Sequence, residues 1–308
     1  MNNIYTSFKI KHENQLDKKP ILYKIFILHY TPKQHRTMKI NFAILISFVL
    51  LNSISAQSDT RYLSSYFKFN PGSTEQIFAN DVKFRKEPDT NSDVIDLLKI
   101  GTEIKIIEQS EQTQKFDGVE SNWYKIEFNG KTGYVLGALI SMRNLTTADN
   151  KNLYFQIKSD ENDRIAIKIR HLLNETEYKE HIFNLIGYEF SVDLLANNGF
   201  QNVKNIIAIN YLAEACGVEG GVSYIFWDGN DLKHIADLSS ISEAGMFYYQ
   251  EKFVFPNQPE GVTDKLVYEV ERGTIEDEET NWVKTYKEKR EYVWTGTELV
   301  PEFSKSKE

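Results

Sequence analysis

The chain has almost no cysteine. Cys216 is the only one among 308 residues, so an internal disulfide is excluded. Its neighbours are mostly apolar residues and glycines, which predicts a small buried thiol rather than a reactive one.

The motifs of common catalytic sites are also missing. The chain contains no Gly-x-Ser-x-Gly, no His-Glu-x-x-His and no glycine-rich phosphate loop. Cys216 has no His or basic residue beside it, and the stretch that follows, 217–221, is rich in glycine. Nothing local favours a thiolate. We expect no enzymatic activity and no cofactor.

Short acidic turns are the remaining candidates for metal binding. Asp160 and Asp163 form one pair, Asp228 and Asp231 another, and residues 276–279 are an acidic run. None has the twelve-residue spacing of a calcium loop. We expect solvated turns and no metal site.

Acidic residues outnumber basic ones outside the N-terminal segment. The net charge is -8, yet residues 1–56 hold eight Lys and Arg residues and only two acids, so the rest of the chain is more acidic still. Such a surface repels the phosphates of nucleic acids and anionic lipids. Neither is an expected partner.

Residues 38–57 have the layout of a secretory signal. Lys39 follows Met38, residues 40–51 are an apolar run, and small residues lead up to Ala56. The run is shorter than the roughly 20 residues that a membrane span needs. We expect translation to start at Met38, cleavage after Ala56 and a mature chain from Gln57 without a stable membrane anchor. Residues 1–37 would then be a doubtful upstream extension, with a long positively charged leader as the alternative.

After a polar lead-in, 57–76, residues 77–142 alternate between short β-type runs and turns. Five strands are predicted, at 82–85, 94–98, 103–107, 123–128 and 132–135. Asn129-Gly130 between two alternating runs is a strong hairpin signal, because both central residues of that turn need positive φ. Five strands in this length predict a small barrel or sandwich.

These residues resemble the bacterial SH3 (SH3b) domain family. The resemblance rests on 82–88, Ser92–Ile95, 98–102, Asn122–Ile126 and 129–135, in matching order and spacing. The chain departs from the family with Glu87 before Pro88, with Tyr134 in place of Trp, and with an insertion at 109–121 expected as a long polar loop. The resemblance implies a small β-barrel that recognises cell-wall peptides, often beside a hydrolase domain.

Three aromatic residues are the candidate ligand-binding residues: Trp123, Tyr124 and Tyr134. Aromatic walls with a few polar groups suit a short peptide. The alternative is that they pack in the core. For Arg85 we expect a role in bracketing a turn rather than in binding.

The polar stretch 143–152 predicts a linker to a second β-rich region, 153–303, of no recognised family. Hairpin turns are expected at 160–163 and 228–231, and the pattern Trp-x-Gly-x-x-Leu occurs at 227–232 and again at 294–299. For 205–214 a strand is favoured over a helix. The pattern predicts a larger antiparallel β domain built of repeated hairpins, as a sandwich or a partial propeller.

The sequence thus predicts a mainly β, exported envelope or extracellular protein of a bacterial periplasm or surface. We expect it to bind or to play a structural part, with peptidoglycan or a peptide as partner. The alternative is a cell-wall hydrolase or amidase whose catalytic domain is unfamiliar.

Overall fold

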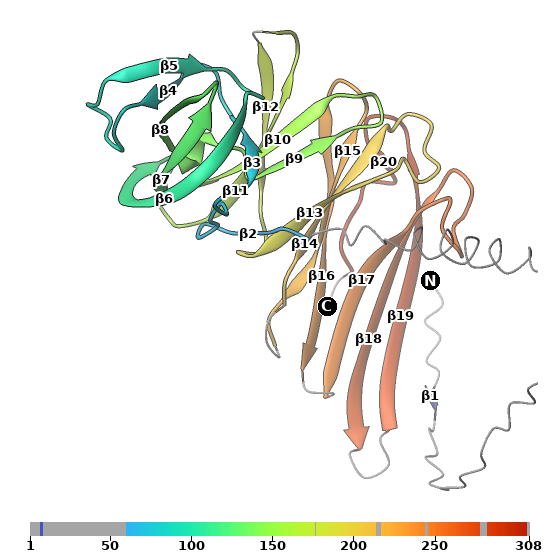
Figure 1. The fold of residues 1–308 in the computed structure, drawn as a ribbon. Coiled ribbons are helices and arrows are strands. Elements are labelled where there is room, and N and C mark those ends of the chain that lie inside the picture. Colours follow the sequence, from blue (N-terminus) through green and yellow to red (C-terminus); the bar gives the residue numbers. More distant parts are fainter. Residues whose placement is uncertain are drawn as a thin grey trace, which may run out of the picture. The chain divides into compact units, whose positions relative to one another are not determined.

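In the computed structural model the described residues are 60–308 without 176, 214–216, 244–245, 278–281 and 307–308, together with the backbone of Ser7 and Phe8. The predicted signal, Gln57 and Cys216 lie outside them. The described chain is built of antiparallel strands in three sheets and one short 3-10 helix (Figure 1). The prediction of a mainly β protein is confirmed.

The first sheet is a six-stranded half-barrel in the order β3-β6-β7-β8-β4-β5. Its elements are β3 (Thr74–Gln76), β4 (Val82–Arg85), β5 (Val94–Leu98), β6 (Glu103–Phe116), β7 (Val119–Phe128), β8 (Lys131–Leu136) and the 3-10 helix η1 (Gly137–Leu139). All five predicted strands are present. The lead-in supplies the sixth, β3, which pairs with β6.

Turn chemistry fixes the half-barrel locally. Asn129 and Gly130, with φ of 49° and 71°, join β7 to β8 as predicted. Arg85 Nη1 donates to the Ser92 carbonyl at 2.6 Å and so bridges the turn between β4 and β5. This is the turn-bracketing role expected for Arg85.

The second sheet has four strands in the order β12-β11-β10-β9. They are β9 (Arg143–Thr146), β10 (Asn152–Ser159), β11 (Ile165–Leu172) and β12 (Tyr178–Asn184). The stretch 143–152, expected as a linker, is therefore partly a strand: β9 pairs with β10 through a tight turn. Its polar residues misled the prediction, because β9 is an edge strand with no fully buried residue.

The third sheet runs in the order β1-β19-β18-β17-β16-β15-β14-β13-β2, with β20 paired to β19. Its strands are β1 (Ser7–Phe8), β2 (Tyr62–Leu63), β13 (Phe190–Leu195), β14 (Asn205–Tyr211), β15 (Gly220–Trp227), β16 (Leu232–Glu243), β17 (Phe247–Val254), β18 (Leu266–Asp277), β19 (Trp282–Trp294) and β20 (Leu299–Val300). Figure 1 shows β16 to β19 as long neighbouring strands. From β13 to β19 each strand pairs with its sequence neighbour, so the predicted repeated hairpins form one large antiparallel sheet.

One hydrophobic core connects all three sheets. It includes Phe84 of the half-barrel, Phe155 and Ile167 of the four-stranded sheet, and Ile207 and Trp227 of the large sheet. Arg170 adds a polar link: its guanidinium donates to the Phe78 carbonyl at 2.9 Å and lies 4.2 Å from the Phe78 ring. Residues 61–308 accordingly belong to one compact unit.

A second core lies on the large sheet alone. It contains aromatic side chains from four strands and from the chain's C-terminal end, among them Phe226, Phe253, Tyr268, Tyr292 and Phe303. Seven of its fourteen buried residues are aromatic, and aromatic side chains bury large areas.

Candidate binding cleft

The described residues form a cleft with a volume of about 790 Å³. Its walls are the loop 64–69 after β2, the start of β7, the helix η1, the strands β10 and β11, and Tyr188 with Glu189 before β13. The half-barrel and the two other sheets thus all contribute to it.

The hairpin of β6 and β7 builds one wall. Its outer part, 109–121, was expected as a polar loop, but the two strands continue to Phe116 and Val119. Register shifts between Ile106 and Glu108 and between Gln109 and Thr113 take up the extra residues. The polar composition misled the prediction because this arm is a two-stranded ribbon with little to bury.

The tip of this arm is anchored on the four-stranded sheet. The Asp117 carbonyl accepts a hydrogen bond from Ser159 N at 2.9 Å, and the Asp117 carboxylate pairs with Lys168, whose side chain is 5% exposed. A Cβ on Gly118 would lie 2.0 Å from the Ser159 carbonyl oxygen, and the φ of Gly118 is +82°. Only glycine fits this contact, so the wall has a fixed position.

Aromatic residues line the floor and the rim of the cleft. On the floor Phe69 meets Tyr124 edge to face at 5.2 Å, and the Tyr124 hydroxyl accepts a bond from Phe69 N at 3.3 Å. On the rim Tyr66 is 86% exposed and Tyr188 is 70% exposed. Exposed tyrosines around a concave site offer large contact area at a small entropic cost.

Polar groups complete the lining. Gln156 is buried and fixed: its Nε2 donates to the Ile140 carbonyl at 2.8 Å, and its Oε1 accepts from Ile157 N at 2.9 Å. Asn122 donates to the Ser110 carbonyl at 3.0 Å across the arm. The charged lining residues are Lys68 and three acids, Glu120, Asp163 and Glu189. This excess of carboxylates favours ligands with an amino group.

The three predicted binding residues do not share one groove. Trp123 is only 4% exposed and packs with Leu136 and Ala138, whereas Tyr124 belongs to the main core and is 2% exposed. Successive residues of a strand point to opposite faces, which separates these two. Tyr134 is partly buried beside the Trp123 cluster. Of the three, only Tyr124 lines the cleft.

The rim residues Tyr66 and Tyr188 escaped sequence reasoning. They lie outside the stretch with the family resemblance and are far apart in sequence. Pairing of β2 with β13, which joins Leu63 to Phe190, brings their two segments together. No local sequence pattern predicts that β2 pairs with β13.

A serine, an aspartate and a histidine also meet on the large sheet, though not as a catalytic triad. Ser223 Oγ donates to Asp237 Oδ1 at 2.5 Å, and His234 Nε2 lies 2.8 Å from the same oxygen. In a triad the histidine stands between the other two. Ser223 is also buried and bonded to the Tyr211 hydroxyl at 2.8 Å.

Two further histidines stack on each other, His171 fully buried and His181 partly buried. The rings of His171 and His181 stack at 5.7 Å, and His171 meets Trp227 edge-on at 4.8 Å. Burial lowers the pKa of both imidazoles from the ordinary value. Neither residue lines the cleft.

The described residues hold neither a membrane-spanning helix nor a cluster of metal ligands. Within that part of the chain no helix has the length and apolarity to cross a membrane. Nor do three or more His, Cys, Asp or Glu side chains there form a group that could hold a metal ion.

Comparison with known proteins identifies one part of the chain. Curated proteins and solved structures gave no match. Residues 80–141, which run from just before β4 to just past η1 and leave out β3, match the family model described as the bacterial SH3 domain.

Proposed function

We propose that the protein is an exported binding protein of the bacterial envelope, and that the cleft takes a short peptide of the cell wall. The observation that carries this is a cleft of about 790 Å³ with tyrosines on its rim, formed in part by a bacterial SH3 domain. Cell-wall peptides are short and contain amino groups, which suits an aromatic site with a surplus of carboxylates.

Binding is favoured over hydrolysis by what lines the cleft. A thiol or serine hydrolase needs a base next to its nucleophile. Among the described lining residues there is neither a histidine nor a cysteine. Ser223 shares the oxygen of Asp237 with His234 instead of donating to the imidazole.

A sedimentation assay with purified peptidoglycan tests the proposal. The double variant Tyr66→Ala/Tyr188→Ala should bind roughly 30-fold more weakly, if each rim tyrosine contributes about 1 kcal/mol. Tyr62→Ala is the matched control, because Tyr62 is also exposed but lies outside the cleft. Its affinity should stay within about twofold of the original.

Two results would contradict the proposal. If the double variant and the control bind peptidoglycan with equal affinity, the cleft is not the binding site. Release of soluble wall fragments by the purified protein would replace the binding function by the hydrolase alternative. If neither result occurs, a glycan and peptide array identifies which part of peptidoglycan the cleft binds.

Export is tested separately. N-terminal sequencing of the protein recovered from outside the cytoplasm should give a start at Gln57. Recovery of the protein only in the cytoplasm, with Met1 or Met38 retained, would contradict export without touching the cleft.

A further inference from the structure

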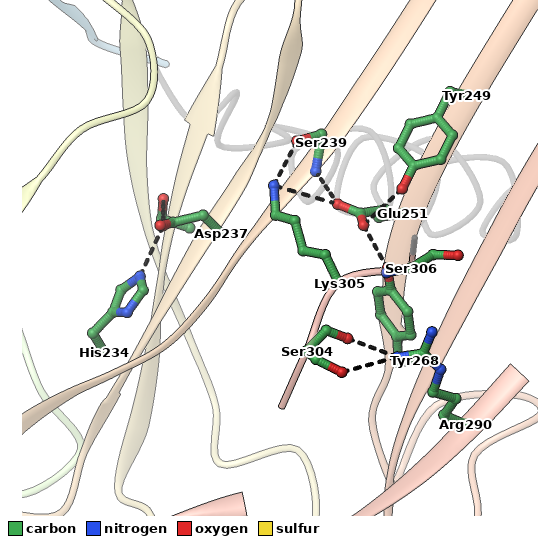
Figure 2. A network of polar contacts seen from close by, with 11 residues as sticks. His234, Asp237, Ser239, Tyr249, Glu251, Tyr268, Arg290, Ser304, Lys305 and Ser306 are labelled. Carbon is green, nitrogen blue, oxygen red and sulfur yellow. Dashed lines mark hydrogen bonds and ion pairs between the residues drawn. The ribbon is translucent and has the colours of Figure 1, made fainter. Parts of the chain in front are cut away.

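The C-terminal tail of the chain lies on the large sheet as a bound peptide would. After β20, residues 302–306 belong to no strand. Figure 2 shows Ser304, Lys305 and Ser306 meeting side chains of β16, β17, β18 and β19. The tail is not paired with any strand of the sheet, so it can detach without breaking the hydrogen bonds between the strands.

Phe303 is the apolar anchor of the tail. Its ring centroid lies 5.5 Å from Phe253, 5.2 Å from Tyr268 and 5.6 Å from Tyr292. Three rings from three neighbouring strands thus form a socket for one aromatic side chain. Such arrangements are typical of the dominant contacts of peptide and protein interfaces.

Glu251 is a buried carboxylate beside this socket. Its side chain is fully buried and accepts bonds from Ser239 N at 2.7 Å, from the Tyr249 hydroxyl at 2.8 Å and from the Tyr268 hydroxyl (Figure 2). These donors fix the carboxylate but bring no positive charge.

The positive charge comes from the tail. Lys305 Nζ lies 3.7 Å from Glu251 Oε2 and donates to Ser239 Oγ at 2.8 Å. The Lys305 side chain is 46% exposed, whereas the Glu251 carboxylate is fully buried, so the lysine reaches the acid from the solvent side. A buried carboxylate is costly without a positive charge nearby, so this position favours a segment that carries a cation.

The two serines of the tail are also recognised. Arg290 Nη1 donates to the Ser304 carbonyl at 2.7 Å. Ser306 N donates to the Tyr268 hydroxyl at 3.1 Å, and Ser306 Oγ donates to Glu288 at 2.6 Å. Each residue from 303 to 306 thus has its own partner on the sheet.

We propose that this surface is a peptide-binding groove for an extended segment with an aromatic residue followed two positions later by lysine, and that the chain's own tail occupies it. We name it the tail groove and define it by Ser239, Glu251, Phe253, Tyr268 and Arg290. The occupant in trans is a partner protein's peptide of the same chemistry, since charge and shape are already matched to it. The tail groove shares no residue with the cleft.

The test uses the full chain with a weakened tail, Phe303→Ala/Lys305→Ala, and a fluorescent peptide, Pro-Glu-Phe-Ser-Lys-Ser. Fluorescence anisotropy should show at least about tenfold tighter binding to this variant than to the original protein, whose own tail competes. Replacing Lys by Glu in the peptide, or adding Glu251→Gln to the variant, should abolish the gain. Glu291→Gln is the matched control, because Glu291 is a half-exposed acid paired with Lys265 outside the groove.

Several outcomes overturn the proposal. If the folded tail variant does not bind the peptide, the surface is not a peptide-binding groove. If the tail variant binds the peptide equally well after Glu251→Gln, Glu251 does not recognise the lysine and the proposal fails. If the tail variant fails to fold, the tail is a structural part of the large sheet and not a detachable ligand. If the tail variant dimerises and no longer binds the peptide, the occupant of the groove is a second copy of this chain and not a partner protein's peptide.

Hydrogen exchange on the original protein gives an independent check. Amides 303–306 should exchange faster than those of β16 to β18, because the tail detaches while the sheet stays closed. Exchange of the tail and the sheet at one common rate would contradict the proposal.

Discussion

Mild acid should destabilise the protein through His171 and His181. The His171 imidazole is fully buried against Trp227, and the His181 imidazole, 11% exposed, stacks on it; desolvation lowers the pKa of both below the ordinary 6.5. The charged groups that face them are Lys151, Lys179, Asp228 and Asp231. His181 Nε2 lies 3.4 Å from Asp231, which only partly offsets its burial.

The sign of the effect follows from the direction of the shift. As the pH falls through 6.5, the unfolded chain takes up protons that the folded chain does not, so the free energy of unfolding decreases. Each histidine contributes at most about 1.4 kcal/mol per pH unit, and the pair about 2.7, until the folded-state pKa values are reached. The window between pH 6.5 and about 5 separates this effect from the carboxylates, whose ordinary pKa values are lower.

Urea unfolding followed by tryptophan fluorescence between pH 7.5 and 5 measures the slope. The double variant His171→Phe/His181→Phe should flatten it over this window. Phe183→Leu is the control, since Phe183 stacks on His181 but does not titrate, and it should lower stability equally at every pH. An unchanged slope in the double variant would refute the reasoning.

Three further predictions concern single residues. Trp123→Ala should lower the free energy of unfolding by about 3–5 kcal/mol in denaturant titrations, because the ring is buried; a loss below about 1 kcal/mol with weaker wall binding would make it a ligand contact instead. Gly118→Ala should cost more than Gly130→Ala in thermal melts, since both have positive φ but only Gly118 would bring its Cβ against Ser159; equal losses would mean that the arm is not anchored. Cys216→Ser should leave peptidoglycan binding unchanged in the sedimentation assay, and a loss of binding by the folded variant would refute this.

Sequence reasoning succeeded where the signal is local. Asn129-Gly130 specifies its turn by backbone conformation alone, and the strands beside it follow from alternation. The predicted turns at 160–163 and 228–231 do connect β10 to β11 and β15 to β16. The resemblance to the bacterial SH3 domain is confirmed over residues 80–141.

The binding surfaces depend on contacts between distant residues and could not be predicted in this way. Tyr66 and Tyr188 meet at the cleft only because β2 pairs with β13. The polar composition of 109–121 hides an ordered arm, because a two-stranded ribbon needs few apolar residues. Trp123 and Tyr124 are adjacent in sequence, yet the pleat sends them into different clusters.

The continuous core has a consequence for the order in which the protein matures during synthesis. The half-barrel is made first, but the buried cluster that contains Phe84 also contains residues as late as Leu232. A nascent chain that ends near residue 150 would leave the inner face of β9 and the neighbouring half-barrel residues open to water. The ribosome must therefore add most of the large sheet's first hairpins before this apolar surface is covered, and until then it is a natural target for a holding chaperone.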